Sequence, residues 1–501
     1  MITGADIRNL LPLQILAGGM LCTMLGIALK RNHTLTFICT LTTLAAAFLS
    51  VLFIWPDGAA LQASGAQTAY SAGGASFAAP HVIGDLFLID RFGCYFQALV
   101  LLSAFIVTLF SQISLKNFYP EKRKEEYYLL LLLATLGATS MVISTHFISF
   151  FVGLEILNIS LYSLISYYRE RPKAIEAGLK YLILAAMSSA LLLFGMALIY
   201  AITGTLSFQG LANTTALPDS GRILMLIAGI GLMITGIGFK LALVPFHMWA
   251  PDIYEGASSP ISGFIASVSK GAMMAVLLRF FMMASLYGFN QIMLVFTVIA
   301  ILSMLTGNLL ALRQNNIKRM LAYSSIAHFG YLMVAFVAGK GMGTQAASFY
   351  LTAYIITILA AFSLITLMSR SDNEAADIED YAGLFWKKPL LAILLSITLL
   401  SLAGIPLTAG FMGKFYLLTA GVGKGNWLLA FILVVSSIIG LYYYLRFIFA
   451  LMRTDGQTAP TVSYPSSPSF VGMLVLSLLG IAVIWLGIFP AWLINLVSRL
   501  T

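Results

Sequence analysis

Four lysines and one glutamate lie inside stretches of this sequence that are otherwise long and apolar. Glu155 lies in HFISFFVGLEILNISLYSLISYY and Lys240 in GFKLALVPFHMWAPDIYEG, and three more such stretches hold Lys180, Lys270 and Lys414. A charge at the bilayer centre costs roughly 2.5–3.5 kcal/mol on the insertion scale, so each must face water or a partner. Several buried cations with one carboxylate have the composition of a charge-relay pathway.

Glu155 belongs to a polar stripe on an apolar helix, because Asn158 and Tyr162 follow it at helical spacing. Two interpretations stay open. The carboxylate either holds two helices together as a structural ion pair, or it tunes a neighbouring lysine by its charge and changes protonation itself. An intramembrane carboxylate is a functional candidate by default, which favours the second interpretation.

Lys240 precedes Pro245 by five residues. A proline inside a helix frees backbone carbonyls one turn earlier, and irregular backbone at membrane depth is tolerated only inside protein or beside water. Lys240 and His247 are seven residues apart, which predicts one shared helix face. A lysine that snorkels to the interface is the alternative. The snorkelling interpretation suits His247, and also Lys180 beside Glu176, better than it suits Lys240.

Lys270 lies in SGFIASVSKGAMMAVLL among small residues, and Lys414 lies in SLAGIPLTAGFMGKFYLL after Pro406. Small neighbours let helices approach and water enter. Two segments, one in each half of the chain, thus combine a helix break (Pro245 or Pro406) with a lysine. Interrupted helices in corresponding halves indicate an inverted-repeat transporter site.

His328 forms another polar face with Ser324 and Tyr331 in NIKRMLAYSSIAHFGYLMVA. It is either a hydrogen-bonded core histidine or a relay group. His146, at a predicted helix boundary, is interpreted as structural. Lys180, His328 and His247 are therefore secondary relay candidates beside Glu155, Lys240, Lys270 and Lys414.

The composition is that of an all-α polytopic membrane protein, with 60% hydrophobic and 9% charged residues. About fourteen segments are long enough to span a bilayer. They lie near 10–29, 35–54, 92–114, 127–144, 147–167, 176–202, 222–247, 259–282, 290–311, 317–338, 345–369, 389–420, 426–452 and 468–492. The segment 389–420 is too long for one straight span and contains Gly404-Ile-Pro406, so we expect two half-helices there.

The net charge of +9 reflects topology, because the basic residues cluster in alternate loops. This positive-inside pattern places both termini outside the cytoplasm and gives no nucleic-acid footprint. Cys22, Cys39 and Cys94 lack the spacing of an iron–sulfur cluster or a structural zinc site. No metal site is predicted.

Two loops differ from the rest in composition. The Gly/Ala/Ser-rich segment Pro56 to Pro80 is predicted to be a flexible external connection. The acidic segment Ser371 to Lys388 is predicted to be a solvated face, with a docking surface for a neighbouring subunit as the alternative.

Four motifs, in order and with their spacing, resemble subunit N of bacterial NADH–quinone oxidoreductase (respiratory complex I), called subunit 2 in mitochondria and chloroplasts. They are FVGLEILNISLYSLISYYRERPKAIEAGLKYLILAAMSSALLLFG, GFKLALVPFHMWAPDIYEGASSPISGFIASVSK, NIKRMLAYSSIAHFGYL and LSLAGIPLTAGFMGKFYLL. The resemblance covers residues from about 125 to 450, and outside that range it is mainly one of hydropathy.

The resemblance implies fourteen helices in which two inverted five-helix repeats each contain a broken helix. It implies three helices over residues 1–125, a first repeat over 126–283, a second over 284–453 and a last helix in 454–501. It also implies one antiporter-like proton channel. In that channel Glu155 is the key glutamate, Lys240 is its partner, and Lys270 and Lys414 lie further along the path, whereas the role of Lys180 is less defined.

A family member of this kind carries no redox site. The resemblance places NADH, FMN, iron–sulfur clusters and quinone in partner subunits of the membrane and peripheral arms, and it implies the bacterial inner membrane as the location. Two alternatives remain open. One is a subunit of a multi-subunit cation/proton antiporter, and the other is a scaffold whose charges are structural pairs.

Overall fold

The computed structural model describes residues 4–55, 81–118, 124–214, 220–369, 374–453 and 469–500. Its first half contains α1 Gly4–Asn9, α2 Leu11–Leu29, α3 His33–Phe53, β1 His81–Ile83, β2 Phe87–Ile89, α4 Arg91–Phe118, α5 Glu125–Val142, α6 Phe147–Ile165, α7 Pro172–Thr203, α8 Phe208–Thr214 and α9 Ser220–Leu241. The predicted Pro56 to Pro80 loop lies outside the described residues.

The second half continues with α10 Trp249–Gly256, α11 Ser259–Phe264, η1 Ile265–Ser269, α12 Lys270–Met283, η2 Leu286–Gly288, α13 Asn290–Ala311, α14 Ile317–Ala338 and α15 Met342–Met368. It ends with η3 Ile378–Tyr381, α16 Leu384–Lys387, α17 Pro389–Ala403, α18 Ala409–Gly423, α19 Trp427–Leu451, α20 Phe470–Ile488 and α21 Ala491–Ser498.

The predicted polytopic helical class is confirmed. Over the described ranges, 12 helical segments are long and apolar enough to cross a membrane, and α17 is a shorter apolar helix. The predicted segment 127–144 is the helix α5, which is not among those 12. The count of fourteen spans stays a prediction.

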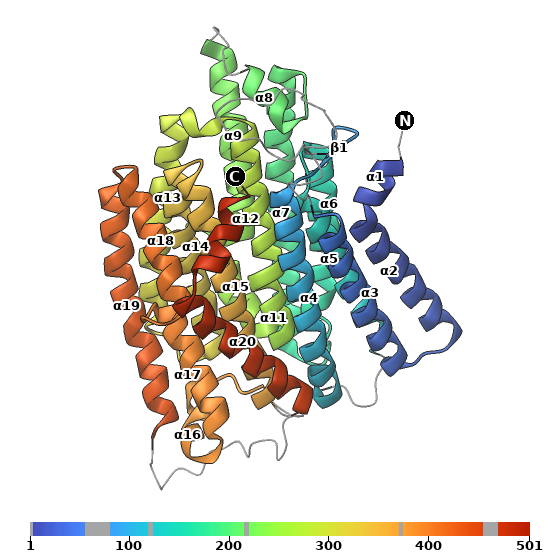
Figure 1. Cartoon of the computed structure of the whole chain (residues 1–501), viewed down its shortest axis with the longest axis vertical. Coiled ribbons are helices and arrows are strands. Elements are labelled where there is room, and N and C mark those ends of the chain that lie inside the picture. Colours follow the sequence, from blue (N-terminus) through green and yellow to red (C-terminus); the bar gives the residue numbers. More distant parts are fainter. Residues whose placement is uncertain are drawn as a thin grey trace.

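Three helical segments form the centre of the bundle. The continuous segment Ser259–Met283, which comprises α11, η1 and α12, is buried within the chain from Ser259 to Phe281, and α14 and α15 are mostly buried. The helices α2 and α3 lie at one side and α19 at the opposite side (Figure 1). Polar groups on the three central segments are therefore shielded from lipid by the protein itself.

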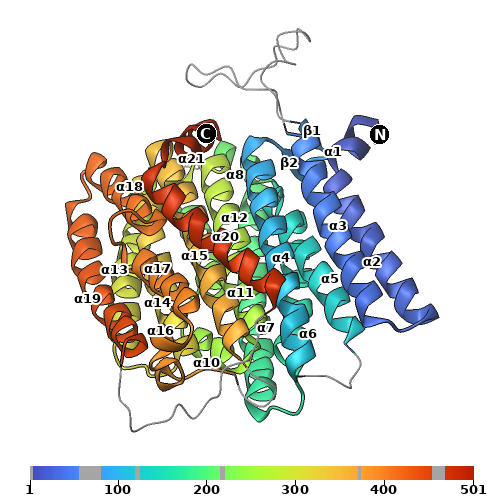
Figure 2. The ribbon, with the colours of Figure 1, turned by 60° about the horizontal axis from the view of Figure 1, so that its bottom comes forward.

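The two ends of the bundle differ in charge. Figure 2 shows the connections from α2 to α3 and from α6 to α7 at one end, together with α10 and α16. We call this the basic end, because it carries most of the basic loops. The two marked chain ends, α1, α8, α21 and the antiparallel hairpin of β1 and β2 lie at the opposite end (Figure 2).

Helix breaks occur at both predicted places. The helix α9 ends at Leu241 and α10 begins at Trp249, so Pro245 lies in non-helical backbone. The helix α17 ends at Ala403 and α18 begins at Ala409, with Pro406 between them. A π-helical turn, Ile265–Ser269, directly precedes Lys270. Such turns are rare and occur often at functional sites.

Backbone contacts bring α7 and α9 close together. A Cβ at Gly195 would lie 2.6 Å from the carbonyl oxygen of Gly229, and a Cβ at Gly229 would lie 3.0 Å from that of Gly195. Small residues at such crossings let helix backbones touch. This packing holds the hydroxyl groups of α7 within reach of Lys240 on α9.

Candidate functional site

Asn158 stands between Glu155 and Lys240. The Asn158 amide nitrogen donates to Glu155 Oε1 at 3.2 Å, and Lys240 Nζ donates to Asn158 Oδ1 at 2.5 Å. The Ser189 hydroxyl on α7 also donates to Glu155 Oε1, at 2.5 Å. Among the ion pairs of the described residues there is none between Glu155 and Lys240. The two charges are therefore coupled through an amide.

Aromatic rings fill the space between Lys240 and Lys270. Lys240 Nζ donates to the Tyr181 hydroxyl at 2.8 Å, and the Tyr181 ring centroid lies 5.3 Å from that of Trp249. Lys270 Nζ lies 5.8 Å from the centroid of Trp249. The Trp249 indole nitrogen donates to the carbonyl of Phe239, so one carbonyl beside the α9 break is paired with a side chain.

Hydroxyl groups bind Lys270 in the centre of the bundle. Its Nζ donates to Ser325 Oγ at 2.8 Å, and the Tyr354 hydroxyl donates to the same oxygen at 2.8 Å. The centroid of the Tyr354 ring lies 5.4 Å from that of His328. Lys270 is fully buried, and its ammonium also lies over the rings of Tyr254 and Phe329.

His328 lies between the Lys270 region and the ring of Tyr331, and Lys414 Nζ lies 5.1 Å from the centroid of that ring. Its Nδ1 lies 2.5 Å from the Tyr350 hydroxyl and its Nε2 lies 3.3 Å from the Tyr444 hydroxyl. Tyr444 also bonds the predicted neighbour Ser324. Tyr331, the other predicted neighbour, contacts His328 by its ring while its hydroxyl accepts from Asn308. The predicted polar face exists, with tyrosines of α15 and α19 completing it.

Backbone carbonyls hold Lys414. Its Nζ donates to the carbonyls of Leu402 at 3.0 Å and Ala403 at 2.8 Å, at the C-terminal end of α17, and to Ser437 Oγ at 2.8 Å. The negative end of a helix dipole suits a cation. A Cβ at Gly404, which has φ +85°, would lie 2.8 Å from Lys414 Cδ. This position therefore requires glycine.

Lys180 lies at the basic end. It is outside the series of Glu155, Lys240, Lys270 and Lys414, which we call the buried series. It forms ion pairs of 2.7 Å with Glu176 and with Asp252, and Arg319 contacts Asp252 at 2.8 Å. A cavity of about 120 Å³ is lined by these four side chains. Burial raises the pKa of the Asp252 carboxyl, but hydrogen bonds from Lys180 and Arg319 hold it below its ordinary value.

Part of the acidic segment is buried, so the prediction of a solvated face is wrong for Glu374. Its side chain is 8% exposed, and its Oε2 lies 2.6 Å from Nζ of Lys318, whose side chain is 1% exposed. The physical reason is that the chain after α15 folds back against the start of α14, where Ile317 N donates to the carbonyl of Ala376.

The prediction that His247 shares a helix face with Lys240 is also wrong. The periodicity argument requires a continuous helix, and the helix stops at Leu241. The His247 ring is buried, and neither ring nitrogen has a hydrogen-bond partner in the described part of the chain.

Sequence reasoning missed Ser189, Tyr181 and Trp249, which come from other segments than the charges they contact. It also missed Lys318. A signal for Lys318 existed, since a lysine follows Asn316 at a helix start where an acidic side chain would be preferred.

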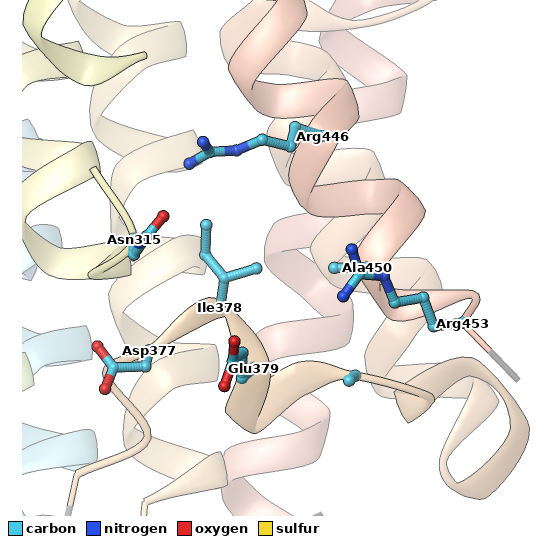
Figure 3. Close-up of a pocket in the computed structure, with 8 residues that line it drawn as sticks. Asn315, Asp377, Ile378, Glu379, Arg446, Ala450 and Arg453 are labelled. Atoms are coloured by element: carbon cyan, nitrogen blue, oxygen red, sulfur yellow. The ribbon is translucent and has the colours of Figure 1, made fainter. Parts of the chain in front are cut away.

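A surface pocket lies away from Glu155, Lys240, Lys270 and Lys414. Figure 3 shows its lining, with Arg446 of α19 pointing toward Asn315. It has a volume of about 380 Å³, and its lining includes Asp377, Glu379 and Arg453. None of the predicted relay residues lines it.

The family described as "NADH:quinone oxidoreductase/Mrp antiporter, TM" matches residues 144–440. A protein of Ectopseudomonas mendocina (strain ymp) named NADH-quinone oxidoreductase subunit N is 41% identical over 507 residues, covering 99% of this chain and 97% of its own length.

Two solved structures are similar over nearly the whole chain. A chain of respiratory complex I from Thermus thermophilus with bound aureothin is 29% identical with a TM-score of 0.80, covering 98% of this chain and 100% of that chain. A chain of the Mrp complex from a Dietzia species is 20% identical with a TM-score of 0.79, covering 98% and 96%, and shows the fold alone. The chain therefore belongs to the family of NADH-quinone oxidoreductase subunit N, the antiporter-like membrane subunits of respiratory complex I.

Proposed function

We propose that this chain moves protons across the bacterial inner membrane through the buried series from Glu155 to Lys414. The observation that carries the proposal is the placement of three buried lysines, Lys240, Lys270 and Lys414, each contacting hydroxyl groups or aromatic rings that lead toward the next. A chain of polar groups with water between them can pass protons without moving the protein far.

The order of steps follows the contacts. A proton from the basic end, which the charge pattern assigns to the cytoplasm, reaches Lys240 and Glu155. It passes to Lys270 and then by His328 toward Lys414, and it leaves on the side that holds both termini. A change in the Glu155 charge alters the field at Lys240 through Asn158 and so gates the transfer.

The driving force comes from outside this chain. Moving one charge against 100 mV costs about 2.3 kcal/mol, and this chain is proposed to hold no redox group. NADH, FMN, iron–sulfur clusters and quinone are assigned to partner subunits of the complex, whose quinone reduction drives the pump. The buried series is then the non-redox, translocating part of an NADH–quinone oxidoreductase.

The test uses the whole complex reconstituted in liposomes, with Lys270→Met in this chain. We expect an assembled complex whose proton uptake per NADH falls while electron transfer to quinone continues. The control is Lys340→Met, which removes an exposed lysine. Full pumping by the Lys270→Met complex would sink the proposal and favour a scaffold.

A further inference from the structure

A buried ion pair at the basic end is not used by the mechanism above. Lys318 of α14 and Glu374 of the segment after α15 are both almost inaccessible and 2.6 Å apart. Replacing such a pair by apolar groups of similar volume is often neutral for stability or even favourable. Bracing the fold is therefore a weak reason for its presence.

The pair contacts the connection between α10 and α11. Lys318 Nζ donates to the carbonyls of Glu255 at 3.0 Å and Ala257 at 2.5 Å, and Glu374 Oε1 accepts from Ser259 N at 3.1 Å. Among the described residues, Arg171 also faces Glu374, with Nη1 4.0 Å from Oε1, and the charge of Glu255 acts on Lys318. Both members of the pair thus lie directly against residues 255–259.

Three hydroxyl groups of this connection are buried without a hydrogen bond to any described residue: those of Tyr254, Ser258 and Ser259. Those of Tyr254 and Ser258 approach Ser325 and Tyr127 without good hydrogen-bond geometry. Buried polar groups in proteins are normally paired with protein or with ordered water. Three unpaired hydroxyls within six residues therefore indicate a place where ordered water pairs with them, which we call the hydrated spot.

The hydrated spot reaches Lys270. The ammonium of Lys270 lies 5.4 Å from the centroid of the Tyr254 ring and donates to Ser325 Oγ. Lys318 and Ser325 are seven residues apart on α14, which places them on one face about 10 Å apart along the helix axis. The residues that carry the three hydroxyls contact both ends of this interval, since Ser259 N donates to Glu374 and the Tyr254 ring faces Lys270.

We propose that the Lys318–Glu374 pair is the gate of a hydrated uptake path that runs by Ser259, Ser258 and Tyr254 directly to Lys270. This inference rests on the proposed function. The Glu374 carboxylate takes a proton from water at the basic end, which releases Lys318. The carboxyl then gives that proton to the hydroxyl and water chain, whose far end protonates the neutral amine of Lys270. Glu374 is again a carboxylate and pairs with Lys318, so the pair is unchanged after each transfer.

The first test compares serines of the same connection in the whole complex in liposomes. The double variant Ser258→Ala/Ser259→Ala and the variant Tyr254→Phe each remove unpaired hydroxyls with little change of volume. We expect each to lower proton uptake per NADH, by no more than Lys270→Met does, because Lys270→Met also blocks the supply from Lys240. The matched control is Ser262→Ala, one turn along α11, whose hydroxyl is already bonded to the carbonyls of Tyr254 and Ser258.

The second test removes the gate. The double variant Lys318→Met/Glu374→Gln removes both buried charges at once, and Arg171, whose side chain is 31% exposed, keeps access to solvent. A brace therefore predicts full pumping, whereas the gate predicts the same loss as in the hydroxyl variants. If this variant does not assemble, Glu374→Asp is the alternative, because it keeps the carboxylate but shortens the side chain by one methylene group. Proton uptake by Glu374→Asp should then shift its pH profile while electron transfer at each pH stays that of the parent complex.

The outcomes separate the two proposals. Loss in Lys270→Met with full uptake in the hydroxyl variants, or an unshifted pH profile in Glu374→Asp, overturns the uptake path alone. Full uptake in Lys270→Met overturns the proposed function as well. Equal loss in Ser262→Ala and in Ser258→Ala/Ser259→Ala also overturns the path, because packing would then explain both.

Discussion

The ammonium of Lys240 donates to the amide oxygen of Asn158 at 2.5 Å. Asn158 at the same time donates to Glu155. A neutral side chain is therefore hydrogen-bonded to a buried cation on one side and to a half-buried acid on the other. An amide has a donor and an acceptor that cannot exchange roles without a flip of the group. The bridge is therefore directional, with its oxygen toward the lysine.

Asn158→Ala should uncouple the two charges. Leaving buried charged groups without their hydrogen bonds costs roughly 1–3 kcal/mol, and we expect proton uptake per NADH to fall as far as it does in Lys240→Ala. Uptake in liposomes is the measurement. Ser160→Ala on the same helix is the control, because within the described residues that hydroxyl bonds the carbonyl of Ile156 alone. Unchanged uptake in Asn158→Ala would refute the bridge.

His328→Leu should interrupt transfer between Lys270 and Lys414. The variant keeps a buried side chain of similar size and removes both bonds to Tyr350 and Tyr444. We expect an assembled complex that has lost the share of uptake that Lys414→Met loses. His33→Gln is the control, since His33 bonds Tyr128 at the periphery. If His328→Leu pumps like the parent complex, His328 is a core histidine only.

Gly410→Ala should destabilise the second helix break. A Cβ at Gly410 would lie 1.8 Å from the carbonyl oxygen of Ser401, so α17 and α18 must separate. Overpacking of this kind typically costs roughly 1–3 kcal/mol and sometimes more. The amount of assembled complex on a native gel and its thermal stability are the measurements. Gly231→Ala, with nothing within 4 Å of the added Cβ, should assemble normally. Equal stability of the two variants would contradict the close approach.

The contacts of α10 at the basic end should weaken in acid. Although burial raises the pKa of Asp252, its bonds to Lys180 and Arg319 lower it overall. A lowered folded-state pKa adds stability that is present above the unfolded value of about 4 and lost as the pH falls through the folded value. The protection factors of the α10 amides, which correct each exchange rate for its intrinsic pH dependence, should therefore be constant from neutral pH to about pH 5 and smaller below about pH 4. Asp252→Asn should reduce the loss of α10 protection in acid. If this variant is as sensitive to acid as the parent, Asp252 is not the cause of that loss.

Local patterns were sufficient to predict the helical class, both helix breaks and the lysines. The break between α17 and α18 follows from Gly404 and Pro406, whose backbone preferences act within one turn. The buried positions of Lys270 and Lys414 follow from the length of the apolar segments around them. These features depend only on neighbouring residues.

The remaining errors concern tertiary contacts. His247 was assigned to the face of Lys240 because periodicity treats the chain as a helix, and α9 stops before it. Glu374 was assigned to solvent because a run of charges carries no information about Lys318, 56 residues earlier in the chain. Tyr181 and Trp249 are ordinary apolar-segment aromatics until the fold places them against Lys240 and Lys270.

The hydrogen bonds from Lys414 to the end of α17 make the electrostatic environment of the last lysine differ from that of Lys240. At the first end, the field around Lys240 depends on an acid whose charge can be cancelled by one proton. At the last end, the carbonyl oxygens of Leu402 and Ala403 keep their partial negative charge at every pH, because a peptide carbonyl does not titrate. In the proposed series, a change of protonation therefore alters the electrostatic field at Lys240, whereas the field of these carbonyls at Lys414 stays constant.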